Sequence, residues 1–208
     1  MKIDKDTLEY RANKIYALEE RDESGNITER MSIEGYAVLF DEPQSYTWGD
    51  TQYTEIIRKG ALDNADMRRV VLRYNHNDNV TALARVKNGS LQLTIDETGL
   101  LVRADLIDTQ TNRDLYKSIQ SGLIDEMSFA FTVAPDGDKW TYEDDYSVVT
   151  REITAIETLY DVSVVDNGFY EKTSVYARAI DKVDTLKKES EQRKLELIKA
   201  KAIAKAKM

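Results

Sequence analysis

His76 is the only histidine in the chain, and imidazole is the side chain best suited to take up and return a proton near neutral pH. It lies in the stretch VVLRYNHNDNV, directly after an apolar segment and inside a turn rich in Asn and Asp. His76 is therefore a candidate general base. An ordinary exposed or hydrogen-bonded loop histidine is the other interpretation, and this stretch alone does not separate the two.

Ser128 could be the nucleophile that such a base activates. It lies in GLIDEMSFAFTV, where it opens a predicted strand after a helix stop at Gly122, and the start of a central strand would mount it rigidly. Alternation along the strand puts three large apolar residues on one face and Ser128, Ala130 and Thr132 on the other. That second face has room for a peptide. The other interpretation is a small strand residue packed for its volume, since the chain has 11 serines.

Asp161 could be the third member of such a site. It lies in ETLYDVSVVDN, where it shares a strand face with Ser163 and Val165. A carboxylate in an apolar strand needs a partner, because burying an unpaired charge is costly. A protonated imidazole would suffice, and an acidic residue that holds the histidine's tautomer is part of a catalytic triad. An ion pair with Lys or Arg would suffice equally.

Composition excludes several other kinds of site. The chain has no cysteine, which removes disulfides, thiol catalysis and cysteine-ligated zinc together. A single histidine excludes any site built on two imidazoles, and the scattered carboxylates suit Mg²⁺ better than Zn²⁺. Nothing in the sequence is like a glycine-rich phosphate-binding loop. We therefore expect no cofactor and no metal.

The charge is unevenly distributed along the chain. The net charge is −9, yet residues 180–208 hold nine Lys or Arg against five Asp or Glu. An acidic body argues against nucleic acid as a partner, because phosphate contacts need a concentrated positive surface. No apolar run approaches the roughly 18 residues of a membrane span, and the N-terminus lacks the hydrophobic stretch of a signal peptide. The sequence predicts a soluble, intracellular protein that uses no membrane.

Short strand-like runs separated by turns predict a mainly β protein with a few helices (α+β), as a barrel or a sandwich. The predicted strands cover residues 33–40, 53–57, 70–74, 81–86, 90–95, 100–107, 127–133, 146–154 and 159–165. Asn88-Gly89 predicts a hairpin, and Asp136-Gly137 predicts another turn. Residues 43–53 either line a substrate groove or form a surface loop that folds Trp48 under.

Two helices are predicted between these strands. Residues 111–121 carry apolar side chains four residues apart and end at Gly122, and residues 60–67 predict a shorter helix. The remaining segments divide the chain into a polar N-terminal arm over 1–32, a folded body over 33–179 and a Lys/Glu-rich helical tail over 180–208. The arm is expected to be loosely ordered or a first edge element. The tail is either a solvated helix or an appendage that binds a partner or is processed.

Five segments of the body resemble a known family. They are IEGYAVLFDE, IIRKGAL, VVLRYNHNDNVTALARV, TGLLVRADLIDTQTNRDLYKSIQSGLIDEMSFAFTV and ITAIETLYDVSVV. Over roughly residues 33–179 the chain resembles the prohead (head-maturation) serine proteases of tailed phages. The stretch from Gly99 to Val133 is specific, because several of its features keep their relative spacing.

The resemblance implies roles for the three residues above. In that family the base is the histidine of the Asn-His stretch, the nucleophile is the serine of the Met-Ser segment, and the usual third member is an acidic residue before Val-Ser. These positions correspond to His76, Ser128 and Asp161, within a protease domain of residues 33–179. The implied fold is a herpesvirus-assemblin-like β-barrel with flanking helices. Arg151 either helps to stabilise the oxyanion or is an ordinary surface arginine.

The function implied by the resemblance is that of a serine endopeptidase. Its substrates would be segments of the phage major capsid protein and scaffold, and also its own termini, inside the assembling procapsid in the host cytoplasm. Family habit also suggests self-association. The alternative is a catalytically silent assembly or scaffolding protein with the same fold, and a metal-dependent hydrolase is a third hypothesis.

Overall fold

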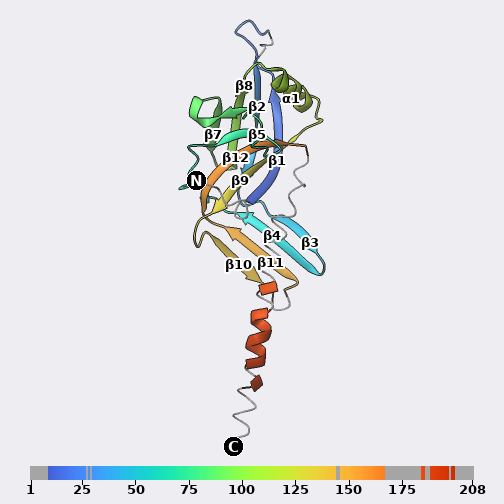
Figure 1. Ribbon diagram of the computed structural model, residues 1–208, viewed down its shortest axis with the longest axis vertical. Helices are drawn as coiled ribbons and strands as arrows, with labels where there is room; N and C mark the ends of the chain where they lie inside the picture. Colours follow the sequence, from blue (N-terminus) through green and yellow to red (C-terminus); the bar gives the residue numbers. More distant parts are fainter. Residues whose placement is uncertain are drawn as a thin grey trace, which may run out of the picture.

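Two β-sheets form the framework of the part of the protein that the structure describes (Figure 1). The structure is a computed structural model that describes residues 9–166, apart from 27, 29, 144 and 145, and residues 184–185, 188–196 and 198–199. The larger sheet has eight strands in the order β6-β5-β12-β9-β1-β2-β8-β7. Their bounds are β1 Glu9–Leu18, β2 Met31–Leu39, β5 Val71–Tyr74, β6 Ala84–Arg85, β7 Leu91–Ile95, β8 Gly99–Leu106, β9 Glu126–Val133 and β12 Ile156–Val165.

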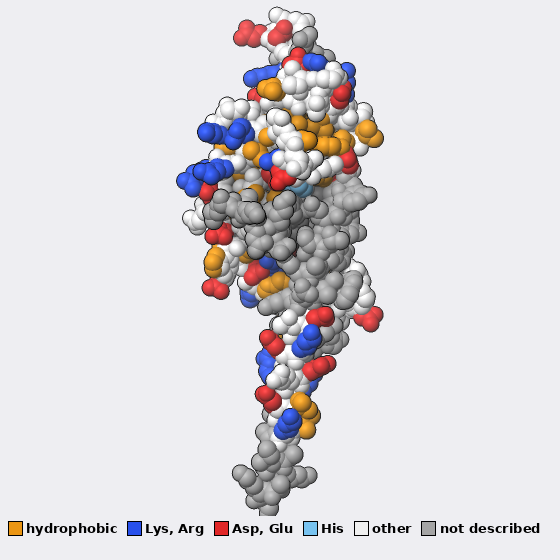
Figure 2. All heavy atoms as spheres, in the orientation of Figure 1, with side chains coloured by type: hydrophobic (Ala, Val, Ile, Leu, Met, Phe, Trp, Pro, Cys, Tyr) orange, Lys and Arg blue, Asp and Glu red, His pale blue; other side chains and the backbone are white. Residues whose placement is uncertain are grey.

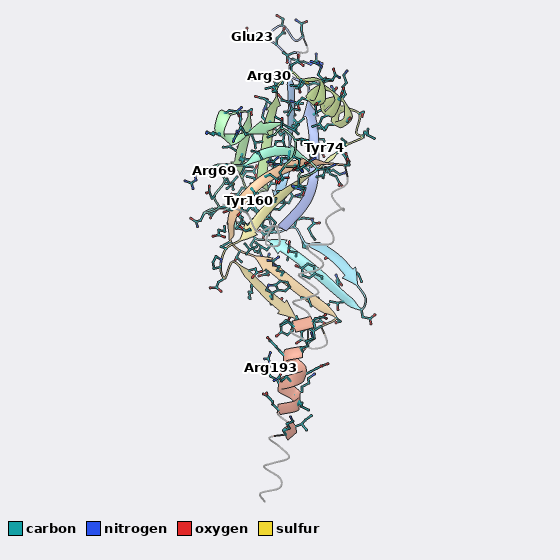
Figure 3. The ribbon with its side chains drawn as sticks, in the orientation of Figure 1. Glu23, Arg30, Arg69, Tyr74, Tyr160 and Arg193 are labelled. Atoms are coloured by element: carbon teal, nitrogen blue, oxygen red, sulfur yellow. The ribbon has the colours of Figure 1, made fainter. Side chains whose placement is uncertain are left out.

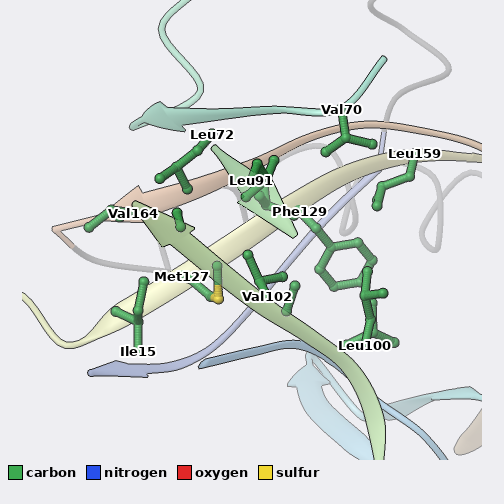
Figure 4. Packing of buried hydrophobic residues seen from close by; sticks show 14 of the residues in the cluster. Ile15, Val70, Leu72, Leu91, Leu100, Val102, Met127, Phe129, Leu159 and Val164 are labelled. Atoms are coloured by element: carbon green, nitrogen blue, oxygen red, sulfur yellow. The ribbon is translucent and has the colours of Figure 1, made fainter. Parts of the chain in front are cut away.

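The larger sheet curls into a nearly closed barrel whose inside is the hydrophobic core. Because side chains alternate along a strand, every second residue points inward, and Figure 4 shows Leu100 and Phe129 among those that meet there. The edge strands β6 and β7 are joined by the short 3₁₀ helix η2 (Val86–Asn88). Next to it the Arg85 N–H donates a hydrogen bond to Ser90 Oγ at 3.0 Å. The mainly β barrel predicted from the sequence is confirmed.

The smaller sheet has four strands in the order β10-β11-β4-β3. Their bounds are β3 Gln44–Trp48, β4 Thr51–Ile57, β10 Asp138–Tyr142 and β11 Val148–Ile153. The two central strands β4 and β11 run parallel, with Glu55 opposite Arg151. Residues 43–53 were expected to be a loop or a groove lining, but most of them form the antiparallel hairpin of β3 and β4.

The predicted helix over residues 111–121 is confirmed as α1, which covers Gln110–Gln120. Its buried residues include Leu115 and Ile119, which join the core of the barrel. The chain leaves the helix through Gly122 at φ +72°, a left-handed conformation that glycine adopts without a steric penalty. This stop fixes where the chain turns back toward β9.

The short helix predicted over residues 60–67 is wrong, because this segment is a series of turns. The Asp63 N–H donates to Gly60 O at 3.1 Å, and the Ala65 N–H donates to Leu62 O at 3.1 Å. Each bond spans three residues, as in a single turn, and none continues into a regular ladder. Leu62 is buried in the core and anchors the segment.

The expectation for residues 1–30, a loosely ordered arm or a first edge element, is wrong for the strand β1. That strand lies between β9 and β2, in the middle of the larger sheet. Ile15 is buried in the core, whereas the neighbouring Tyr16 is 62% exposed. The segment is polar because one of its faces lies outside the barrel. The three-part division of the chain stays a prediction.

The Asn88-Gly89 pair does not make the hairpin that the sequence predicted. Of residues 81–86 only Ala84 and Arg85 form a strand, and that strand pairs with β5. Gly89, at φ +78°, ends the helix η2 instead. The turn predicted at Asp136-Gly137 is present, since the Gly137 N–H donates to Ala134 O at 2.8 Å.

The described part of the tail is helical over residues 188–196, in agreement with the prediction. Leu195 and Ile198 are exposed there. In the part of the chain that the structure describes, no helix combines the length and the apolar character needed to cross a membrane.

Candidate active site

Strand β9 separates its large side chains from its small ones. Met127, Phe129 and Phe131 point into the core, as the alternation predicted. Ser128 and the other small residues therefore lie on the outer face of the barrel, which is the face away from the core. Ser128 is only 4% exposed, so its hydroxyl is held in a solvent-poor place.

Strand β12 brings an acidic residue to the same outer face by means of a β-bulge. Leu159 is paired with Phe131 and points into the core, whereas Asp161 is paired with Ala130 on the next step of β9. Tyr160, labelled in Figure 3, is the extra residue. Strict alternation would have placed Asp161 on the same side as Leu159. The bulge turns the carboxylate outward instead.

The register of the two strands places Ser128 on the same face as this carboxylate. Ser128 is directly opposite Ser163, and opposite residues in an antiparallel pair have Cβ atoms roughly 4.5–5.5 Å apart on one face. Ser163 follows Asp161 by two residues, so the three side chains share the outer face.

His76 reaches the outer face through a tight turn after strand β5. The Asn77 N–H donates to Tyr74 O at 3.1 Å, and both central residues of this turn have positive φ, +50° for Asn75 and +51° for His76. Two positive φ values with such a bond are the pattern of a type I′ turn. Asn tolerates this conformation better than most residues. The amide of Asn75 also donates to Asp166 Oδ2 at 2.9 Å, which fixes the turn against the end of β12.

The imidazole of His76 lies against the carboxylate of Asp161. Nδ1 and Oδ1 are 2.6 Å apart, and the two side chains are 8% and 13% exposed. A carboxylate only accepts hydrogen bonds, so Nδ1 carries the proton and Nε2 keeps its lone pair. The His76 N–H also donates to Ser163 Oγ at 3.2 Å, and that hydroxyl donates to Asp161 Oδ1 at 2.9 Å. The backbone and the ring of the histidine are thus both held.

A tyrosine closes the end of the turn. The Tyr74 hydroxyl donates to the carboxylate of Asp166. Burial, together with this hydrogen bond, raises the pKa of Tyr74 to about 12. The phenol therefore stays protonated at neutral pH and keeps donating, which stabilises the strand ends on either side of His76.

The sequence matches the family of caudovirus prohead serine proteases over residues 16–189. The chain belongs to this family. It is therefore a serine protease with a role in the maturation of phage proheads. Among solved structures it is similar to the capsid assembly protease of bacteriophage T4, with a TM-score of 0.49, 11% sequence identity, and coverage of 76% of this chain and 97% of that chain. A comparison with curated protein sequences gives no match.

Arg151 of the prohead protease lies on β11 of the smaller sheet. This arginine was a candidate oxyanion donor or a surface residue, but its side chain is 9% exposed and belongs to the smaller sheet. Its guanidinium contacts Glu55 Oε2 at 3.2 Å and Asp138 Oδ2 at 2.7 Å, and it stacks over Trp140 at 5.3 Å from the ring centre. These contacts fix the guanidinium within the smaller sheet.

Of the three residues predicted from the sequence, His76 contacts Asp161 and Ser128 lies on the same face of the barrel, but sequence reasoning missed the residues that support them. Ser163 bridges His76 and Asp161, and its signal was present, because it was expected on the same strand face as Asp161. Asn75 supports the turn. Its positive φ, a conformation that favours Asn, could not be predicted from the sequence. Among the described residues, no three His, Cys, Asp or Glu side chains come together to hold a metal ion.

Proposed function

We propose that this prohead protease cleaves peptide bonds with Ser128 as nucleophile, His76 as general base and Asp161 as the residue that holds the imidazole. The observation that carries the proposal is the 2.6 Å contact between His76 Nδ1 and Asp161 Oδ1. It leaves Nε2 as the basic atom, on the barrel face where Ser128 is paired with Ser163. Family membership supplies the reaction class.

The reaction follows from these positions. Ser128 Oγ attacks the carbonyl carbon of the substrate while its proton passes to His76 Nε2. Asp161 stabilises the imidazolium that forms. When the tetrahedral intermediate collapses, the C–N bond breaks and His76 gives the proton to the leaving amine. A water molecule then attacks the acyl-enzyme, loses its proton to His76, and Ser128 recovers its hydrogen as the acid is released.

The substrates in this proposal are segments of the phage major capsid protein and scaffold, together with the protease's own termini. Cleavage would take place inside the assembling procapsid, in the host cytoplasm. The basic tail, with nine Lys or Arg against five Asp or Glu over residues 180–208, would tether the protease to scaffold or be removed during maturation. A silent assembly protein with the same fold is not favoured for a member of a protease family.

The decisive experiment incubates the capsid precursor with wild-type protein and with Ser128→Ala. We expect fragments only with the wild type. Ser118→Ala, which changes a serine of α1 whose hydroxyl bonds to Asp114 O, is the matched control and should cleave like the wild type. Identical fragments from wild type and Ser128→Ala would contradict the proposal. The same digestion in a chelator tests the metal-dependent hydrolase, and full cleavage there would exclude it.

A further inference from the structure

Most arginines of this acidic protein are neutralised by a carboxylate. Among the arginines whose side chains the structure describes, ion pairs to Asp or Glu involve Arg21, Arg30, Arg58, Arg68, Arg103, Arg113, Arg151 and Arg193. Within that same described set, Arg69, Arg73 and Arg85 form no ion pair with a carboxylate, although Asp66, which is paired with Arg68, lies close enough to Arg69 to interact with it electrostatically. This is unexpected, since Asp and Glu number 38 against 29 Lys and Arg.

Two of the three exceptions lie on the strands beside the candidate active site, and the third lies just before one of these strands. Arg73, on β5, is directly opposite Ser163 of β12. Arg85, on β6, is directly opposite Val71, and Val71 is in turn opposite Asp161. Arg69 precedes Val71 by two residues. We call Arg69, Arg73 and Arg85 the arginine surface.

The arginine surface lies on the outer face of the barrel, as Ser128 does. Leu72 points into the core, so Arg73, which follows it on β5, points outward. Arg69 lies in the turn before β5, next to the buried Val70. Arg69 and Arg85 are exposed and Arg73 is half-buried. Figure 3 labels Arg69 at the flank of the barrel, and Figure 2 shows basic side chains gathered on that flank, near η2 and the start of β5.

One row of paired residues runs from the nucleophile to this surface. Ser128 is opposite Ser163, and Ser163 is opposite Arg73. Since neighbouring strands are ~4.8 Å apart, the Arg73 backbone is roughly 10 Å from that of Ser128. An extended peptide advances ~3.4 Å per residue. A substrate side chain two or three residues from the cleaved bond therefore comes within reach of a long arginine side chain.

The position of His76 indicates whether the substrate residues before or after the cleaved bond lie near the arginine surface. His76 hands its proton to the leaving amine, so that amine lies beside the imidazole. The His76 turn comes directly after β5, and Arg73 supports the turn by donating to Asn77 O at 3.0 Å. The substrate segment that follows the cleaved bond thus continues toward β5 and β6.

We propose that the arginine surface selects substrates that carry Asp or Glu within the first few residues after the cleaved bond. Guanidinium groups bind carboxylates through paired, charge-assisted hydrogen bonds, and among the described residues these three form no hydrogen bond or ion pair with a carboxylate. The proposal rests on the catalytic roles given above, because they set the direction of the substrate.

The first test measures binding and needs no catalysis. Ser128→Ala protein is titrated with two fluorescent twelve-residue peptides that are identical except that one has three glutamates in its C-terminal half where the other has glutamines. We expect the glutamate peptide to bind roughly five- to tenfold more tightly at low salt, with the preference shrinking as salt is added. Adding Arg69→Gln, Arg73→Gln and Arg85→Gln should remove the preference.

Arg113→Gln is the matched control for these changes, because Arg113 lies on α1 and pairs with Asp108. It should leave the preference intact. Equal affinity for the two peptides, no measurable binding of either, or an unchanged preference in the triple variant would each overturn the proposal.

The second test reads the cleavage sites in a mixture of unfolded proteins by mass spectrometry. Wild-type sites should be enriched in Asp or Glu on the C-terminal side of the cut, and Arg73→Glu should shift the enrichment toward Lys or Arg. Active wild-type enzyme without that enrichment overturns the arginine proposal alone. Absence of all Ser128-dependent cleavage overturns the proposed catalytic roles. In that case the binding titration still tests whether the arginine surface binds acidic peptides.

Discussion

Two regions of the protease bury a carboxylate, and the carboxylate has a different kind of partner in each region. On the barrel, Asp161 is paired with the imidazole of His76, and both side chains are largely buried. In the smaller sheet, Glu55 is paired with the guanidinium of Arg151, and these are 2% and 9% exposed. Each carboxylate needs a partner, since an unpaired buried charge is costly.

The partner of the carboxylate distinguishes the proposed catalytic site from the structural pair. A guanidinium remains charged at any pH a protein survives, so the Arg151 cluster offers no proton to exchange. An imidazole gains and loses its proton near neutral pH. Only the barrel pair can therefore take part in acid–base chemistry, and the pair in the smaller sheet can only stabilise. Breaking the His76–Asp161 pair should therefore mainly reduce activity, whereas breaking the Arg151–Glu55 pair should mainly reduce stability.

The largest effect on activity is expected from Asp161→Asn. The amide retains the shape but favours the wrong tautomer of His76, so kcat/KM for peptide cleavage should fall by about 10³- to 10⁴-fold. Circular dichroism should report an unchanged fold. A variant that keeps more than a tenth of wild-type kcat/KM would mean that the pair is not part of the catalytic machinery.

The largest effect on stability is expected from Arg151→Met, which leaves the carboxylate of Glu55 buried beside an apolar chain. The free energy of unfolding should fall by about 3 kcal/mol, as measured by urea denaturation, while kcat at low temperature stays within twofold of wild type. The double variant Arg151→Met with Glu55→Leu should recover part of the loss. A large drop in kcat without a loss of stability would reverse the assignment of the two regions.

An intermediate effect is expected from Ser163→Ala, which removes the acceptor of the His76 N–H and a donor to Asp161. Activity should fall by about tenfold and stability by about 1 kcal/mol. Ser32→Ala is the control, since this buried serine bonds Glu20 Oε1 at 3.0 Å and Asp105 Oδ1 at 2.8 Å, in another part of the barrel. It should lose similar stability without losing activity. Equal activities of the two variants would show that Ser163 does not position His76 and Asp161 for catalysis.

The smallest effect is expected from Asn75, whose left-handed conformation shapes the His76 turn. Asn75→Ala should cost about 1 kcal/mol in the free energy of unfolding, because alanine keeps the Cβ that crowds the backbone at positive φ but lacks the polar side chain that makes this conformation acceptable for asparagine. Asn75→Gly accepts that φ and should retain more stability and activity, although both variants lose the bond to Asp166. Thermal melts and kcat/KM of the two variants side by side check the order. A stability and activity of Asn75→Ala equal to or higher than those of Asn75→Gly would contradict this prediction.

The sequence predicted the elements whose pattern is local. Strand β9 alternates large and small residues over its whole length, so the outward direction of Ser128 followed from its neighbours alone. Helix α1 has a regular apolar stripe and a glycine stop. The pairing of His76 with Asp161 depended on the family resemblance, because 85 residues separate them and no local pattern relates two such positions.

The elements that were missed depend on distant partners. Strand β1 looks polar because its inward residues, such as Ile15, alternate with exposed ones such as Tyr16. Strand β4 finds its parallel neighbour β11 almost a hundred positions away, with Glu55 opposite Arg151. The bulge at Tyr160 is defined only against β9. None of these pairings leaves a signal in neighbouring residues.

Ser128 lies on a strand between β1 and β12, and this placement determines when its surroundings form during synthesis of the chain. Its strand β9 is hydrogen-bonded on one side to the first described strand of the barrel and on the other to the last. A ribosome therefore releases the first of these partners long before the second exists. Ser128, the proposed nucleophile, therefore has both of its neighbouring strands only after β12 has been translated, so the proposed active site is completed late in synthesis. Cleavage within β1 would damage a neighbour of β9 and inactivate the finished enzyme, whereas cleavage after β12 would leave the barrel intact.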